Sequence, residues 1–90
     1  MTPAASAAAL RRALAVLESL PEITLASAEP PMRRLAEELG LEAGQLFGML
    51  RVAVTGQKVS PPLFESMEII GREKVLQRVR RALQALEQGT

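Results

Sequence analysis

The sequence lacks several of the residues on which protein chemistry most often depends. Its 90 residues include no Cys, no His, no Asp, no Trp and no Tyr. Without Cys, disulfide frameworks and thiolate metal sites are excluded, and without His most zinc chemistry and the commonest general acid–base are excluded as well. An enzyme of this composition would depend on Glu and Lys for all of its chemistry. The composition therefore argues strongly against a self-contained catalyst, and we expect this chain to hold no cofactor and no metal.

Long apolar runs and sheet-like patterns are also scarce. No apolar stretch approaches the ~20 residues that a membrane-spanning helix needs, so we expect no membrane association. A β-sandwich would need alternating aromatic and β-branched residues, whereas the aromatic residues here are two Phe. The abundance of Ala and Leu favours thin, closely packed helices instead. Because 90 residues correspond to one domain, we predict a single all-α domain over residues 1–90, a compact bundle or cage of about five short helices.

The alanine-rich start of the chain can imitate a transit peptide, because it carries arginines and few acids. Its apolar residues nevertheless follow a helical period from Leu10 to Leu20, and Glu18 lies inside this period. We therefore predict an ordinary first helix over residues 3–19, ended by Pro21. On this interpretation the protein is cytoplasmic.

The second helix is the hardest to place. Ile23 followed by Thr24 resembles a hydrophobic staple with an N-cap, but Pro30 and Pro31 would then lie too deep inside the helix. Either a separate turn precedes the prolines or the helix starts near residue 28, and we favour a helix over residues 29–39. On this helix two i,i+4 pairs indicate a solvated face: Arg33 with Glu37, and Arg34 with Glu38.

A short polar link joins the third and fourth helices, which are predicted over residues 42–54 and 61–70. Gly56 suits a left-handed helix stop, because glycine has no Cβ that would clash there. Ser60 followed by Pro61 resembles an N-cap and the first residue of the next helix. The link is therefore held between two well-marked helix ends.

Two further features concern the third and the last helix. Gly44 and Gly48 each cost about 1 kcal/mol in a helix relative to Ala. Their spacing of four places them on one side, which suggests that another helix packs closely against them. The last helix is predicted over residues 72–87, with one apolar stripe along its length.

The charge is unevenly distributed along the chain. Residues 1–45 carry four Arg and six Glu, a net charge of −2, whereas residues 46–90 carry seven Arg and Lys and four Glu, a net charge of +3. This asymmetry is suggestive of an anionic partner. Part of it is a basic stripe on the last helix, formed by Lys74, Arg78 and Arg81.

Three motifs follow one another in the second half: LRVAVTG at residues 50–56, PPLFE at 61–65 and GRE at 71–73. Together they resemble the C-terminal anticodon-binding region of bacterial glutamyl-tRNA synthetase, a class I aminoacyl-tRNA synthetase. The similarity extends more weakly upstream through LAEELG at residues 35–40 and covers nearly all of the chain. It departs from the family at Ile23, where a Trp often precedes the Thr. The nucleotide-binding signatures of a class I catalytic domain are absent.

The resemblance implies a helical cage that binds the anticodon loop of glutamate tRNA, as the last domain of a longer, monomeric glutamate–tRNA ligase used in translation. The partners would be that tRNA and the remainder of the synthetase. ATP and Mg²⁺ would bind only in the catalytic domain, and a preceding domain would discriminate the first anticodon base. Carried over residue by residue, the contacts with the second and third anticodon bases fall on Arg51, Ser60, Pro61, Pro62 and Leu63.

Physical chemistry supports some of these assignments and leaves others open. The planar guanidinium of Arg51 can stack on an unstacked base or bond two acceptors on its edge. A helix-dipole role and an ion pair with Glu65 are the structural alternatives. Pro61 and Pro62 have no N–H and offer a stiff apolar ledge to a base. Leu63 either extends this ledge or turns inward.

Four cations are candidates to follow the RNA backbone and to add salt-sensitive affinity without sequence information: Lys58, Lys74, Arg78 and Arg81. A solvated basic face is the alternative for each of them. From another functional class, the alternative is a protein–protein interaction module that uses an apolar groove between helices and has no RNA role.

Overall fold

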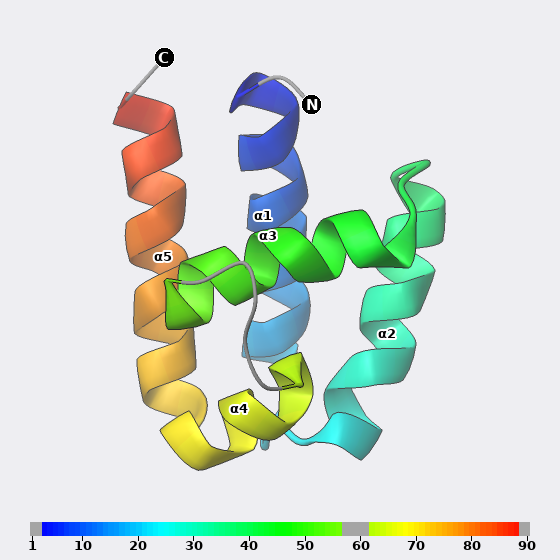
Figure 1. Ribbon diagram of the computed structural model, residues 1–90, viewed down its shortest axis with the longest axis vertical. Helices are drawn as coiled ribbons and strands as arrows, with labels where there is room; N and C mark the ends of the chain where they lie inside the picture. The colour runs from blue at the N-terminus through cyan, green and yellow to red at the C-terminus, as the bar shows by residue number, and fades with distance from the viewer. Residues whose placement is uncertain (1–2, 57–61, 89–90) are drawn as a thin grey trace.

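The computed structural model describes residues 3–56 and 62–88, and these residues form five helices (Figure 1). The helices are α1 (Pro3–Ser19), α2 (Leu25–Glu38), α3 (Ala43–Thr55), α4 (Leu63–Ile70) and α5 (Arg72–Gln88). The described residues contain no strand. The prediction of an all-α fold with about five helices is therefore confirmed, and α1, α3 and α5 match their predicted ranges to within one residue at each end.

The two longest helices, α1 and α5, lie side by side and run in opposite directions (Figure 1). They share the most extensive contact of any two helices. In the view of Figure 1, α3 crosses in front of α1 and reaches α5, while α4 lies below α3 and leads into α5.

The core is the space that these helices enclose. Among the described residues no polar or charged residue is buried. Burial of a Leu, Val or Met side chain stabilises a fold by roughly 1.5–3 kcal/mol, so this apolar core is the main source of stability. Its largest fully buried side chains come from all five helices: Leu17, Met32, Leu46, Leu50, Val54, Met67, Val75 and Val79. Within the described ranges, no helix combines the length and hydropathy that crossing a bilayer requires.

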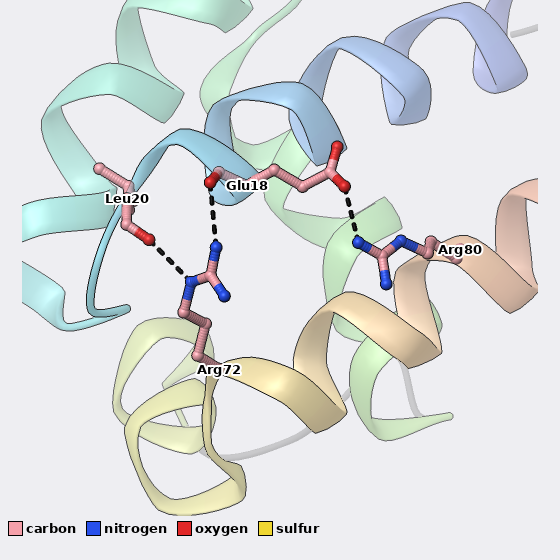
Figure 2. Close-up of polar contacts among 4 residues, drawn as sticks. All are labelled: Glu18, Leu20, Arg72 and Arg80. Carbon is pink, nitrogen blue, oxygen red and sulfur yellow. Dashed lines mark hydrogen bonds and ion pairs between the residues drawn. The ribbon is translucent and has the colours of Figure 1, made fainter.

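Arg72, at the first position of α5, ties the corner between α4 and α5 to the end of α1 (Figure 2). Its Nε donates to the carbonyl oxygen of Leu20 at 2.8 Å, and its Nη2 donates to the carbonyl oxygen of Glu18 at 3.0 Å. The carboxylate of Glu18 accepts a further bond from Arg80 at 2.6 Å. Carbonyls at a helix C-terminus lack helical partners and carry partial negative charge. Arg72 therefore stabilises them through its hydrogen bonds and through its positive charge.

The predicted start of the second helix at residue 29 is wrong. α2 begins at Leu25 and contains the Pro-Pro pair in its interior. Thr24 is its N-cap and forms a capping box with Ser27. The Ser27 backbone N–H donates to Thr24 Oγ1 at 3.1 Å, and the Thr24 backbone N–H donates to Ser27 Oγ at 2.9 Å. A cap of this kind stabilises a helix by about 1 kcal/mol, and α2 also buries Met32 completely. These two gains offset part of the cost of a proline pair that removes two backbone donors.

The ion pairs predicted along α2 have different partners in the structure. Arg33 pairs with Glu29 at 3.2 Å and not with Glu37. Acid before base is the favourable order for an i,i+4 pair, because it agrees with the helix dipole. Glu38 bonds Arg12 of α1 at 2.9 Å instead of its predicted neighbour on α2. The side chains are largely exposed, so each pair stabilises the fold by less than about 1 kcal/mol.

The link between α3 and α4 begins as predicted but ends differently. Gly56 closes α3 with a φ of 76°, which is the left-handed stop expected for a glycine. α4, however, begins at Leu63, and its N-cap is Pro62, whose ψ of 133° is extended. The predicted start of this helix at residue 61 is therefore wrong, and its predicted N-cap, Ser60, lies outside the described residues. A residue that precedes a proline is disfavoured in the helical region, so the first proline of a pair is a poor start for a helix.

Gly44 and Gly48 do not face a closely packed helix. A Cβ placed on either glycine would meet no heavy atom within 4 Å. The prediction of close helix packing at these positions is wrong, and the side of α3 that carries them is open.

Candidate nucleic-acid interface

α3 places Arg51 at the edge of the core. Leu50 and Val54 on the same helix are 0% and 1% exposed, and the helical period leaves Arg51 partly buried beside them. Its Nε is the one buried side-chain polar atom of the described residues that has no hydrogen-bond partner. A buried donor without an acceptor costs about 1–3 kcal/mol, and native structures contain few such groups. An acceptor supplied by a ligand would remove this cost.

The structural alternatives for Arg51 are not supported by its surroundings. Within the described residues no ion pair joins Arg51 to Glu65, which is exposed on α4. The carbonyl groups at the end of α3 find other donors, because Thr55 Oγ1 donates to the Arg51 carbonyl at 2.6 Å and Arg78 Nη1 donates to the Val54 carbonyl at 2.7 Å. The arginine that caps α3 is therefore Arg78 from α5.

The predicted backbone-binding cations fall into two groups. Arg78 bonds the end of α3, a contact between residues 24 positions apart that no local pattern indicates. Lys74 and Arg81 are exposed on α5, as the prediction requires, and their contact with RNA stays a prediction. Lys58 lies outside the described residues.

The structure describes one proline of the predicted ledge and decides between the two alternatives for Leu63. Pro62 is exposed, whereas Leu63 is 3% exposed and belongs to the core. Of the two alternatives for Leu63, the structure shows the inward one, so its side chain offers no surface to a base in this conformation. Ser60 and Pro61, which complete the predicted contact set, lie outside the described residues.

Two phenylalanine rings hold the start of α4 against α3. Phe64 and Phe47 meet edge to face, with 5.1 Å between ring centroids and 87° between ring planes. The guanidinium carbon of Arg33 lies 5.6 Å from the centroid of Phe47, which is within cation–π range. Aromatic pairs of this geometry add roughly 0.5–1.5 kcal/mol to the area they bury. The two rings thus hold α3 and the start of α4 in contact on either side of the link.

An apolar groove of about 820 Å³ lies between α1, α3 and α5. Val52, which lines it, is 45% exposed, an unusual value for a large apolar side chain. The sequence suggested a groove between helices only in general terms, because its position depends on the crossing of three helices. Its lining combines an apolar wall with two cations and includes Leu10, Gly48, Met49, Val52, Arg78 and Arg81.

The candidate contact residues described above are cationic or apolar. Among the described residues no group of three acidic side chains could hold a metal ion. Guanidinium groups, an ammonium group and an exposed apolar surface match a polyanion with unstacked bases, because bases stack on apolar or guanidinium surfaces and phosphates attract cations. These residues are therefore a candidate nucleic-acid interface.

The same conclusion follows from similarity to known proteins. A family model described as an anticodon binding domain matches residues 1–83, and the chain belongs to this family of anticodon-binding domains. It is 50% identical over 88 residues to a glutamate–tRNA ligase of Dehalococcoides mccartyi, and the match covers 98% of this chain and 18% of the relative.

Two further glutamate–tRNA ligases show the same relation. Those of Roseiflexus castenholzii and Mycobacterium leprae are 44% and 53% identical over 86 and 68 residues. These matches cover 96% and 74% of this chain, and 17% and 14% of the relatives. The chain thus spans less than a fifth of the length of the relatives it matches.

Proposed function

We propose that the chain is the tRNA-binding module of a glutamate–tRNA ligase and that it binds the anticodon loop of glutamate tRNA. Its family and the shared name of its relatives support a role in tRNA recognition during translation. The structural observation that carries the proposal is the buried, unpartnered Nε of Arg51 at the end of α3. Arg51 as a residue is only partly buried, so part of its side chain remains accessible to an acceptor from outside the protein.

Arg51 can read a base because its guanidinium is a planar group of donors at the edge of the core. The guanidinium presents N–H donors in a rigid plane, and a base edge offers oxygen and nitrogen acceptors in matching geometry. Partial burial of Arg51 strengthens such bonds, since the local dielectric is lower than that of water. A base with the wrong acceptor pattern would leave the buried donor unpaired. Discrimination then follows from the cost of that unpaired donor.

The other predicted contacts support binding without base specificity. The exposed ring of Pro62 is a stiff apolar surface against which a base can pack, and the same role is proposed for Pro61. Ser60 is proposed to contact a base through its backbone. Leu63 holds the start of α4 in the core and acts on the RNA only through that position.

Phosphate contacts and the wider context complete the proposal. Lys74 and Arg81, together with Lys58, are proposed to attract the RNA backbone. The ligase reaction, with its ATP and Mg²⁺, is assigned to the remainder of a longer synthetase, which is the second partner. We expect the module to work in the cytoplasm and as a monomer.

The test measures binding of glutamate tRNA to the chain and to an Arg51→Ala variant, with fluorescence anisotropy at low and moderate salt. We expect the wild-type chain to prefer the natural anticodon over tRNAs substituted at the second or third anticodon base. Loss of a bidentate base contact reduces discrimination by roughly 1–3 kcal/mol, so the Arg51→Ala variant should bind all these tRNAs almost equally.

An Arg34→Ala variant is the matched control, because it removes one exposed positive charge from α2, away from the α3–α4 corner. It should retain the preference for the natural anticodon. Wild-type binding that is indifferent to every anticodon substitution would contradict the proposal, whatever the affinity.

A further inference from the structure

The groove between α1, α3 and α5 is adjacent to the Arg51 site but separate from it. Val52 lines the groove and directly follows Arg51 on α3, while Arg51 itself is not among the lining residues. The volume of about 820 Å³ falls within the range of roughly 300–1,000 Å³ that is typical of sites for small ligands. The groove is therefore large enough to hold a ligand group of its own.

The charged side chains that line this groove are cationic. Arg78 and Arg81 line it from α5, and none of the described residues that line it is acidic. Arg78 uses Nη1 to bond the Val54 carbonyl, which leaves other donors of its guanidinium available, since the group has five N–H bonds. The remaining wall is apolar and includes Met49 and Val52. This combination suits a ligand with an anionic end and a flat apolar body.

Gly48 keeps the groove open. It lies in the interior of α3, where glycine is the least favourable residue after proline, and no close packing explains its presence. A side chain at this position would meet no protein atom within 4 Å of its Cβ and would enter the groove that Gly48 lines. Gly44 differs, because it is in the first turn of α3 and does not line the groove.

We propose that this groove holds an unstacked nucleotide of the RNA loop next to the bases read at Arg51. The base packs against the apolar wall formed by Met49 and Val52, and its phosphate bonds Arg81, with Arg78 at the inner end. The inference rests on the proposed function, since it assigns a second contact to the same RNA. Its chemistry favours a nucleotide over a protein helix, because two guanidinium groups flank one short apolar wall and none of the described lining residues is acidic.

The experiment titrates the ¹⁵N-labelled 90-residue chain with the anticodon stem-loop of glutamate tRNA, and follows backbone amide shifts and affinity by NMR. Gly48→Leu fills the groove, and Gly44→Leu is its matched control on the same helix. We expect Gly48→Leu to weaken stem-loop binding about fivefold or more, the low end of what loss of one stacked base causes in single-strand binding. Gly44→Leu should change the affinity less than twofold, which is below the smallest effect of losing one stacked base.

Two further measurements keep the result interpretable. Thermal unfolding should show both leucine variants at least as stable as the wild-type chain, because leucine is a better helix former than glycine. In the wild-type chain, the stem-loop should shift the amides of Gly48, Val52 and Ala82 in addition to those around Arg51. Should Gly48→Leu fail to fold, two other measurements test the groove proposal: these amide shifts in the wild-type chain, and the stem-loop affinity of an Arg81→Gln variant, which should be lower than that of the wild-type chain.

The outcomes separate the two proposals. Stem-loop binding that depends on Arg51 but is unaffected by Gly48→Leu would overturn the groove proposal and leave the proposed function intact. Absence of binding by any RNA would overturn both. A third outcome would point to a protein partner for the groove and overturn the nucleotide proposal. In that case a synthetic amphipathic helix with Glu on its polar face would shift the groove amides, and the stem-loop would not.

Discussion

Two corners of this small domain contain an arginine at a helix end, and they differ in how its donors are used. At the corner where α5 begins, Arg72 donates to two carbonyl groups at the end of α1 (Figure 2). At the corner where α3 ends, the buried Nε of Arg51 has no acceptor. The first arrangement stabilises the folded chain, whereas the second leaves a donor that the folded chain does not use.

Arg78 shows that the difference does not come from the helix end alone. It reaches the last turn of α3 and bonds Val54 there, so α3 already has its own capping arginine. Arg51 is thus surplus to the structural needs of the corner in which it lies. A side chain that is partly buried, charged and structurally surplus is the kind that binding explains.

The largest expected effect comes from Arg72→Ala. The change removes two charge-assisted hydrogen bonds that join α5 to α1, and we expect the free energy of unfolding to fall by about 2 kcal/mol. For a domain of this size that corresponds to a fall in Tm of roughly 10 °C. Urea and thermal unfolding measure it. Arg72→Lys should recover only part of the loss, because a single ammonium group cannot reproduce the planar fork. An Arg72→Lys variant as stable as the wild-type chain would contradict the two-carbonyl account.

Arg78→Gln should have the next largest effect. It removes the bond to Val54 at the end of α3, and we expect a loss of about 1–1.5 kcal/mol in urea unfolding. The same variant tests the predicted backbone contact, because loss of a phosphate contact lowers the slope of log affinity against log salt by about 1. A stable Arg78→Gln variant with a reduced salt slope would show that the side chain serves RNA and not α3.

Arg51→Met should act in the opposite direction to Arg72→Ala. Replacing the unpartnered buried donor by an apolar side chain of similar length removes its desolvation cost, so we expect the free energy of unfolding to rise by about 1 kcal/mol. Anticodon discrimination should be lost in the same variant. A clear fall in stability would show that the Arg51 guanidinium has a structural role and would weaken the contrast between the two corners.

Glu18→Gln should have the smallest effect. It removes the ion pair with Arg80, in which the two side chains are 44% and 51% exposed, and such pairs contribute roughly 0.2–1 kcal/mol. The Glu18 carbonyl that accepts from Arg72 remains in place. The difference from the wild-type chain should disappear at high salt, and a loss as large as that of Arg72→Ala would mean that the carboxylate, not the carbonyl, holds the corner.

The sequence predicts those features that depend on neighbours along the chain. Helical period placed α1, α3 and α5, and the lack of a Cβ placed the left-handed stop at Gly56. The start of α2 was missed because local rules treat a proline pair as a helix breaker, whereas burial of Met32 and the Thr24 cap act together against that cost. Helix propensity is assigned to one residue at a time, so it does not include the combined effect of a cap and a buried side chain.

The site was predictable only in part, for a related reason. The family motif indicated Arg51, but its orphan Nε appears only when the helices around it are in place. The inward turn of Leu63 and the bond from Arg78 to Val54 depend on how α4 and α5 pack against α3. The groove likewise exists only between three helices, so its lining could not be read from any single stretch.

The open surface beside Gly44 has a practical consequence. Because the sequence contains no Cys, a Gly44→Cys substitution would introduce a single thiol at a helical position where a side chain meets no neighbouring atom within 4 Å. A fluorescent dye attached there would report on α3 from outside the groove. The same attachment at residue 48 would occupy the groove that Gly48 lines, so the two labelled chains would compare RNA binding with an open groove and with a filled one.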